Sequence, residues 1–288
     1  MLKDIVCGVK SQLNNLVLNQ ENMTEIALAA FFAGGHILLV GPAGLGKTQW
    51  AQTLAQTLGM PYKREWLMQG TQPHEVFGGD QHRRIAQVLI AEEIDSANPR
   101  VKTILMDTME NQAAAIEGHC TPMPEPFFVI ATNNTPCTLP EALNDRFMLS
   151  MQVSYPGLAA EKQLLQMYHE GKPSQTPVPV CNPEAIAQAK EEVNAIIAEE
   201  EIFNYILSIV ETTRRAAAVA TGASPRGSIA LLLAAKAYAA INGRDFVETK
   251  DVQSLALPVL RHRIVLKPEA IKEGILPDHI IESILAKQ

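Results

Sequence analysis

Aromatic residues, positive charge, paired cysteines and long apolar runs are all scarce in this sequence. Aromatic residues make up 5% of its 288 positions, and 31 acidic against 24 basic side chains give a formal net charge of −7. An acidic chain without a basic, aromatic-containing stripe lacks the means to grip nucleic acid or an anionic membrane surface, so we expect neither partner. The 47% of hydrophobic residues is nevertheless typical of a folded globular protein and excludes a disordered chain.

Cysteine chemistry is also limited. The four cysteines are Cys7, Cys120, Cys137 and Cys181. They form no CxxC pair and have no histidine at metal-ligand spacing, which excludes a disulfide scaffold and a zinc ribbon. We therefore expect isolated, reduced thiols in a cytoplasmic protein.

No apolar stretch reaches the length of about 20 residues that a membrane-spanning helix needs. The stretch 26–40 is interrupted by two glycines and a histidine, and the stretch 229–241 contains Lys236. Charged residues and a glycine likewise break residues 1–15 before they form the apolar core of a signal peptide. We expect a soluble protein that is not inserted into a membrane.

The first half of the chain alternates between short apolar runs and helical patterns. The apolar runs, at 36–40, 87–91, 127–131 and 148–153, predict buried strands, and helices are predicted at 47–58 and 99–110. Continuous apolar strands separated by helices are typical of a parallel sheet that is covered on both faces. The first half is therefore predicted to be an α/β domain.

The composition changes at residues 171–183, which contain four prolines and show no helical period. Beyond them the strand-like runs disappear, and helices are predicted to begin at Asn182 and to cover 202–215, 225–242 and 249–260. We predict three parts: a core over residues 1–171, a linker over 172–181 and a small all-helical domain over 182–288.

Residues 41–48 match the phosphate-loop pattern GxxxxGK[ST] at every position. The loop comprises Gly41, Pro42, Ala43, Gly44, Leu45, Gly46, Lys47 and Thr48. Glycines allow backbone N–H groups to curl around phosphates, Lys47 supplies a positive charge, and the Thr48 hydroxyl is placed to bind Mg²⁺. The loop follows a predicted strand and opens a predicted helix, so the helix dipole also faces the phosphates.

Polar residues follow two other predicted strands. Glu92 and Glu93 come directly after one apolar run, where the first acid is expected to hold the Mg²⁺ water shell and the second to orient or deprotonate an attacking water. Asn133 and Asn134 follow the next run, at the strand end where ligands bind in parallel sheets. An asparagine there is suited to positioning the water beside a γ-phosphate.

Four further motifs strengthen the pattern: ATNN at 131–134, LPEALNDRF at 139–147, SPR at 224–226 and LRHRI at 260–264. Together with the phosphate loop, in this order, they resemble the AAA+ ATPases and more closely the MoxR family. The resemblance extends from about Asn19 to Leu266. It implies an αβα nucleotide-binding domain with a helical lid, and ATP and Mg²⁺ as ligands.

The resemblance also implies a function and the roles of several residues. Members form rings, usually hexamers, and hydrolyse ATP to remodel or mature partner proteins, commonly with a von Willebrand factor A domain protein as client or adaptor. By the same comparison Asn134 corresponds to sensor 1, Arg146 to the arginine finger that reaches a neighbour's γ-phosphate, and Arg226 to the lid's sensor 2, which touches the nucleotide. Guanidinium groups suit these roles because they are always charged and fork onto phosphate oxygens.

The sequence departs from the family pattern in three places. Glu92 stands where the family has Asp, which moves the carboxylate by roughly 1.5 Å in a site that requires near-octahedral Mg²⁺ geometry. The segment 78–86 is shorter than its family counterpart, and Thr135 replaces a common proline, which leaves Asn133 as an alternative to Asn134 for the sensor role.

Two other functions are compatible with parts of the sequence. In a nucleotide-gated scaffold, Glu92 would slow hydrolysis and ATP would serve mainly to set the shape of the ring. A small-molecule kinase needs the same phosphate loop, but it predicts an active monomer that is indifferent to loss of Arg146, and the motif at 224–226 argues against it. We expect an ATPase.

Overall fold

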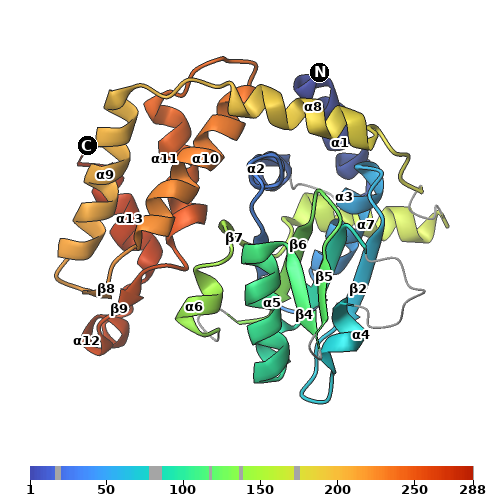
Figure 1. The fold of residues 1–288 in the computed structure, drawn as a ribbon, viewed down its shortest axis with the longest axis horizontal. Coiled ribbons are helices and arrows are strands. Elements are labelled where there is room, and N and C mark those ends of the chain that lie inside the picture. The colour runs from blue at the N-terminus through green and yellow to red at the C-terminus, as the bar shows by residue number, and fades with distance from the viewer. Residues whose placement is uncertain (17–20, 78–85, 117–118, 136–138, 172–175, 288) are drawn as a thin grey trace.

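The computed structural model of this chain describes residues 1–288 except 17–20, 78–85, 117–118, 136–138, 172–175 and 288. A parallel sheet with helices on both faces lies beside a group of helices from the C-terminal part of the chain (Figure 1). The segment 78–86, which is shorter than its family counterpart, therefore lies outside the described residues except for residue 86, and Cys137 lies outside them as well.

The main sheet has five strands in the order β2-β3-β6-β1-β7, and every neighbouring pair is parallel. The strands are β1 (Ile37–Val40), β2 (Tyr62–Trp66), β3 (Val88–Glu92), β6 (Phe128–Asn133) and β7 (Leu149–Gln152). Because all the strands run in one direction, their carboxyl ends lie along one edge of the sheet. The residues that follow β1, β3 and β6 are brought together there.

The strands alternate between two hydrophobic cores. In β1, Ile37 and Leu39 face one core, while Leu38 and Val40 face the other. The helices α2 (Glu21–Phe32) and α3 (Lys47–Thr57) belong to the first core, and α1 (Leu2–Leu16) packs against both of these helices. The second core contains α5 (Pro99–Asn111) and α4 (Pro73–Phe77). Burial on both faces explains why the sequence of these strands is continuously apolar.

The four strands predicted from apolar runs are confirmed to within two residues at each end. The strand β2 was not predicted, because its sequence YKREW lies at the edge of the sheet and is only partly buried. The helices α1 and α2 and the antiparallel hairpin of β4 (Ala113–Ile116) and β5 (His119–Pro122) were also missed.

The C-terminal part is helical, as predicted. Its helices are α8 (Pro183–Asn194), α9 (Glu200–Arg215), α10 (Pro225–Ile241), α11 (Thr249–Leu260), α12 (Pro268–Lys272) and α13 (Pro277–Leu285), with a short pairing of β8 (Val219–Thr221) and β9 (Val265–Leu266). Asn182 caps α8 through its side-chain oxygen, as predicted. The start of α11 is capped by the reciprocal pair Glu248 and Asp251.

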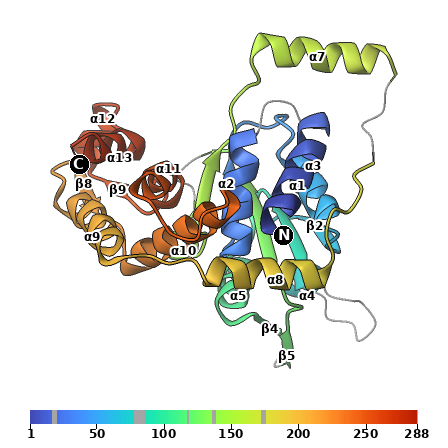
Figure 2. The ribbon, with the colours of Figure 1, turned by 90° about the horizontal axis from the view of Figure 1, so that it is seen from above.

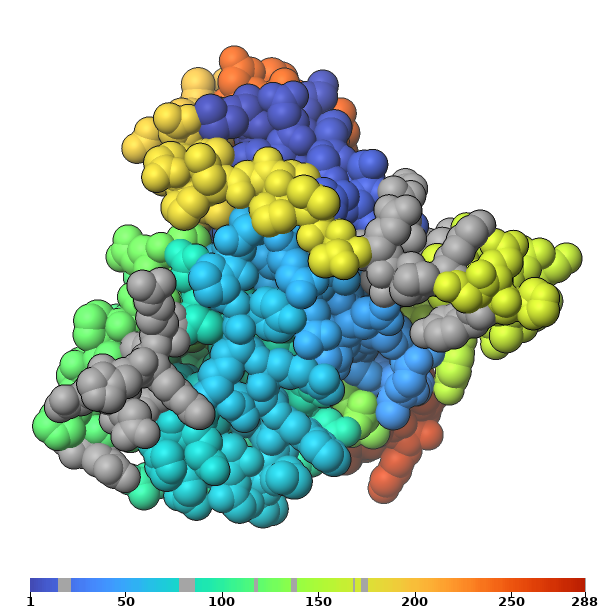
Figure 3. Space-filling model, turned by 90° about the vertical axis from the view of Figure 1, so that its right-hand side faces the viewer, coloured from blue at the N-terminus to red at the C-terminus, as the bar shows by residue number. Residues whose placement is uncertain are grey.

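These helices share one hydrophobic core with the first face of the sheet. Both α8 and α10 pack against α2, and Figure 3 shows the yellow α8 lying along the dark-blue N-terminal helix. In contrast, α7 (Leu158–His169) stands out to one side of the molecule (Figures 2 and 3). Within the described residues, no helix is both long and apolar enough to cross a membrane.

Candidate nucleotide site

The phosphate loop lies between the end of β1 and the start of α3, at the carboxyl edge of the sheet. Gly44 and Gly46 have φ of 84° and 74°, the left-handed region that favours glycine. At Gly41 a Cβ would lie 2.2 Å from the carbonyl oxygen of Val153, whereas at Gly44 and Gly46 the space where a Cβ would stand is open. Glycine is therefore required at Gly41 by a close backbone approach and at the other two by backbone conformation.

Lys47 is buried at the first position of α3. Its Nζ donates to the carbonyl oxygens of Gly41 at 2.5 Å and Pro42 at 2.8 Å, and to Oδ1 of Asn134 at 3.2 Å. Burial lowers the pKa of Lys47, and the charge of Glu93 acts in the opposite direction. Among the described residues no carboxylate forms an ion pair with this ammonium. A buried cation that is surrounded by neutral acceptors is suited to receive an anionic ligand.

Asn134 and Glu93 continue the network from Lys47. The Asn134 amide donates from Nδ2 to Oε1 of Glu93 at 3.1 Å, and the indole Nε1 of Trp66 donates to Oε2 at 3.0 Å. The backbone of Glu93 is left-handed, with φ of 51°, and its N–H donates to the hydroxyl of Thr132. A left-handed glutamate is costly, so the surrounding contacts hold this carboxylate in a specific place.

Asn133 and Asn134 differ in their contacts with the site. Asn134 joins Lys47 to Glu93, while Asn133 is buried in β6 and its carbonyl oxygen accepts from the N–H of Gly41. Of the two residues left open by the sequence, the structure brings Asn134 into the site.

Glu92 is engaged by an arginine that the sequence analysis missed. Arg64 of β2 donates from Nη2 to Oε2 of Glu92 at 3.1 Å and from Nε to Oε1. The carboxylate raises the pKa of Arg64. Arg64 and Trp66 have the same orientation on β2 and hold Glu92 and Glu93 respectively. No sequence signal could have found them, because the strand itself was not predicted.

Arg146 and Arg226 lie together, but not in hydrogen-bond contact with the phosphate loop within the described residues. Nη1 of Arg146 forms an ion pair with Oε2 of Glu110, and Nη2 of Arg226 donates to Oε1 of the same carboxylate at 2.7 Å. Glu110 lies in the last turn of α5 and was not singled out from the sequence. The hydrogen bond from Arg146 is the largest cause of its lowered pKa.

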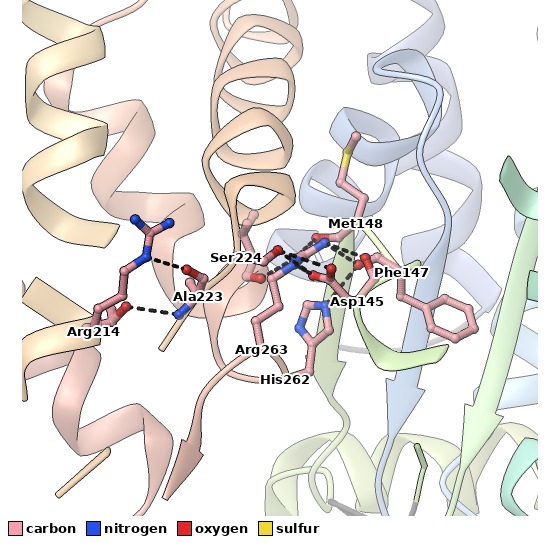
Figure 4. Close-up of polar contacts among 10 residues, drawn as sticks. Asp145, Phe147, Met148, Arg214, Ala223, Ser224, His262 and Arg263 are labelled. Carbon is pink, nitrogen blue, oxygen red and sulfur yellow. Dashed lines mark hydrogen bonds and ion pairs between the residues drawn. The ribbon is translucent and has the colours of Figure 1, made fainter. Parts of the chain in front are cut away.

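The loop that carries Arg146 is fastened to the helical part by its neighbour Asp145 (Figure 4). The Asp145 carboxylate accepts from the hydroxyl of Ser224, at 3.1 and 3.2 Å, and from Nε of Arg263 at 2.9 Å. Arg263 also donates to the carbonyl oxygens of Phe147 and Met148 at 2.8 and 3.0 Å. The motifs at 224–226 and 260–264 thus meet the motif at 139–147.

A second contact reinforces this attachment. The ring of His262 lies 2.9 Å, through Nε2, from the carbonyl oxygen of Phe147. Burial and the adjacent charge of Arg263 keep the pKa of His262 well below its usual range, so the ring is neutral and Nε2 donates. The loop that carries Arg146 is therefore attached to the start of α10 and to the residues that follow α11.

The residues at the carboxyl edge of the sheet fit a nucleoside triphosphate and a divalent cation. Open space adjoins Gly44 and Gly46, a buried ammonium has no acidic partner among the described residues, and half-buried Thr48 follows it in the first turn of α3. Thr48 and Glu92 supply hydroxyl and carboxylate oxygens, the ligands that Mg²⁺ prefers.

Two family models match the chain. The model described as "ATPase family associated with various cellular activities (AAA)" matches residues 36–149, and the model "AAA lid domain" matches residues 211–284. The first covers the strands β1 to β6 with the phosphate loop and ends at the first residue of β7, and the second covers most of the helical part.

Three relatives match nearly the whole chain. The "Uncharacterized protein YeaC" of Bacillus subtilis is 33% identical over 95% of this chain and 91% of its own length. "Chaperone MoxR1" of Mycobacterium tuberculosis is 28% identical, with 95% of this chain and 79% of its own length covered. A crystal structure of a protein assigned as an ATPase from Cytophaga hutchinsonii superposes with a TM-score of 0.90 at 29% identity, covering 100% of this chain and 95% of that one.

The parallel sheet, the phosphate loop and the helical lid define an AAA+ ATPase. Within that class, the chain belongs to the MoxR family, whose members match it along almost its full length. The fold predicted from the resemblance is confirmed.

Proposed function

We propose that this protein binds ATP with Mg²⁺ at the phosphate loop and hydrolyses it in a ring assembly. The observation that carries the proposal is the chain of hydrogen bonds from Lys47 through Asn134 to Glu93, which places a cation, an amide and a carboxylate at one edge of the sheet. Phosphoryl transfer to water is catalysed by cations on the phosphates and by side chains that orient or deprotonate the attacking water, and these three groups can serve those purposes.

Each residue has a distinct task in this proposal. The backbone N–H groups of the loop and the ammonium of Lys47 bind the phosphate oxygens, and Asn134 holds the attacking water in line. Glu93 accepts the proton of that water, since its carboxylate is fixed by two N–H donors. Thr48 and Glu92 would hold Mg²⁺, which would neutralise negative charge on the phosphate groups.

Arg146 and Arg226 are proposed to act on the nucleotide of an adjacent subunit. Both arginines bind the carboxylate of Glu110, which supports a joint action on one nucleotide. The alternative is that Arg146 is an arginine finger for the neighbouring subunit and Arg226 a separate sensor of the nucleotide in its own chain. Two guanidiniums beside a γ-phosphate would stabilise the charge that develops in the transition state. The ring is proposed to be a hexamer, as is usual among AAA+ proteins.

The work done by the ring is proposed to be remodelling or maturation of partner proteins. The name of the M. tuberculosis relative, a chaperone, supports this role. A von Willebrand factor A domain protein is the proposed client or adaptor, and the cytoplasm the proposed location. The domain limits 1–171, 172–181 and 182–288 stay predictions alongside these proposals.

A second candidate is a nucleotide-gated scaffold with slow turnover. The contact of Arg64 with both oxygens of Glu92 favours it, because a carboxylate held by a guanidinium is less available to a metal ion. The variant Glu92→Asp separates the two candidates. A large rise in turnover supports the scaffold, whereas no change in an already active enzyme removes it.

The decisive test is ATP turnover per chain as a function of protein concentration, for the wild type and for Arg146→Ala. A specific activity that rises with concentration and disappears in the variant supports a site shared between subunits. Turnover that is independent of concentration and of Arg146 would contradict the ring ATPase. ATP binding without turnover at any concentration would favour the scaffold.

A further inference from the structure

One carboxylate, that of Glu110, holds two arginines from distant parts of the chain. Arg146 comes from the loop before β7, and Arg226 from the first turn of α10, 116 residues after Glu110. Each guanidinium takes a different oxygen of the carboxylate. Glu110 therefore links the sheet domain to the lid at the point where the two arginines meet.

The stability of α5 does not account for this glutamate. Glu110 lies in the last turn of the helix, where a negative charge faces the negative end of the helix dipole. Its side chain is 42% exposed, so it contributes little to the core, and the helix ends one residue later. The carboxylate makes its contacts with the two arginines.

The two arginines depend on this carboxylate for their arrangement. Without it, two guanidiniums that meet at one place would repel each other and separate. Arg146 is only 17% exposed and its Nε is buried with no hydrogen-bond partner in the described part of the chain, so the ion pair at Nη1 directs its guanidinium. The hydrogen bond and charge of Arg146 lower the pKa of Glu110, so the carboxylate stays charged at a pH where an ordinary glutamate begins to be protonated.

The contact with Glu110 occupies only some of the N–H donors of each arginine. A guanidinium carries five N–H donors, and each arginine gives the carboxylate a single nitrogen. Apart from the buried Nε of Arg146, the other donors form no hydrogen bond or ion pair with the described residues and are available to an anion that approaches from outside the chain. A carboxylate placed between two such groups sets the distance between them and halves their excess charge.

We propose that Glu110 is a positioning residue, which holds Arg146 and Arg226 side by side so that they reach the γ-phosphate in an adjacent subunit together. This inference rests on the proposed function. Glu110 does not touch the nucleotide; it acts through the two arginines.

The first experiment compares the steady-state ATP turnover of Glu110→Ala, Glu110→Asp and the wild type. We expect the alanine variant to lower kcat by about tenfold to a hundredfold, because misplacing a catalytic group by about 1 Å has effects of this size. The KM for ATP should change little, since the residues that bind the nucleotide in the same chain are intact. Aspartate keeps the charge and should recover part of the loss.

The matched control is Asp107→Ala. Asp107 lies one turn earlier on α5, is exposed, and forms no ion pair among the described residues. It should keep the wild-type kcat. Far-ultraviolet circular dichroism and the melting temperature verify that each variant is folded, and Glu110→Gln, which preserves the shape of the side chain, replaces the alanine variant if that variant does not fold.

The second experiment mixes subunits. Glu110→Ala chains have an intact phosphate loop, and Glu93→Gln chains have an intact pair of arginines, so mixed rings contain sites that combine the two. We expect turnover in the mixture to exceed that of either variant alone. A merely structural defect in the Glu110→Ala chain would not be restored in this way.

The same mixture made with Arg146→Ala separates the two proposals. Suppose that Glu93→Gln chains restore the turnover of Arg146→Ala, so that the shared site stands. The role of Glu110 is then refuted if Glu110→Ala alone is as active as the wild type or more active, or if it is inactive and Glu93→Gln chains do not restore its turnover. If Arg146→Ala is not restored, or is fully active alone, the shared site itself is refuted, and the inference about Glu110 falls with it.

Discussion

Asp145 and Arg263, 118 residues apart in the sequence, form an ion pair with a distance of 2.9 Å between Nε and Oδ1. The guanidinium also donates to the carbonyl oxygens of Phe147 and Met148, the two residues before β7, and the carboxylate also accepts a hydrogen bond from the hydroxyl of Ser224. Ser224 stands at the N-cap of α10 without capping it, so its hydroxyl is free for this contact. The pair thus joins the lid to the loop that carries Arg146.

Removing the carboxylate of Asp145 should be strongly destabilising. The side chain of Arg263 is 3% exposed, and burial already lowers its pKa, so Asp145→Ala leaves a buried charge without its partner. We expect a loss of about 3 to 5 kcal/mol in the free energy of unfolding, measured by urea denaturation. The control is Arg215→Ala, which breaks the exposed pair with Glu211 and should stay within about 0.5 kcal/mol of the wild type.

The stability of the protein should fall in mildly acidic solution because of His36. This ring is buried at the start of β1; its Nδ1 accepts from the N–H of Val129, and Nε2 faces the carbonyl oxygen of Met109. Burial, with a smaller effect of the charge of Lys190, lowers the pKa of His36 from 6.5 to about 4. A depressed histidine pKa stabilises the fold above pH 6.5, and this contribution is lost as the pH falls towards 4.

The expected loss from His36 is about 3 kcal/mol between these limits. Urea denaturation at pH 7 and pH 5 should measure about 2 kcal/mol of this loss, because pH 5 lies only part of the way to the lowered pKa, and the buried His262 should add to it in the same direction. His36→Gln should flatten the pH dependence, whereas the same change at the exposed His119 should leave it intact. Equal pH dependence in the wild type and in His36→Gln would refute the assignment.

Lys47→Ala should abolish the effect of nucleotide on stability. The ammonium is buried beside neutral acceptors, so its removal takes away the charge that a triphosphate needs while no partner carboxylate is left unpaired. In the wild type we expect ATP with Mg²⁺ to raise the melting temperature. In the variant that shift should vanish, while Lys250→Ala, whose side chain is 68% exposed, should retain it. An undiminished shift in Lys47→Ala would place the nucleotide elsewhere.

Arg64→Ala should lower the Mg²⁺ concentration that is needed for tight ATP binding. The guanidinium holds both oxygens of Glu92 and competes with a cation for them, so we expect a several-fold shift when it is removed. Titration of a fluorescent ATP analogue at a series of Mg²⁺ concentrations measures the change. Lys63→Ala is the matched control on the same strand, because Lys63 contacts Glu65 and the end of α4 instead of Glu92 or Glu93. A shift in the opposite direction would mean that Arg64 helps to form the metal site.

Local sequence patterns were sufficient for the elements that bind phosphate. The apolar runs around 36–40 and 127–131 predict buried strands because both faces of the sheet are covered, and Gly44 and Gly46 predict a loop because their left-handed backbone angles disfavour other residues. These causes act within a few neighbouring residues. The same is true of the cap at Asn182.

The partners of the site residues depend on contacts that no local pattern records. Nothing in YKREW shows that Arg64 and Trp66 will lie beside Glu92 and Glu93, since that requires β2 to pair with β3 in one register. The choice between Asn133 and Asn134 also required the structure, because adjacent residues at a strand end point in opposite directions.

The sequence by itself determined the parallel sheet, the phosphate loop and the family, because each depends on short-range spacing and backbone preference. Only the tertiary structure decided that Glu110 gathers Arg146 and Arg226, and that Asp145 is bound by Arg263. Ion pairs between residues that lie far apart in the sequence leave no periodic trace in it. They form where packing brings charges together, and in this protein the packing of α10 and α11 against the sheet domain does so.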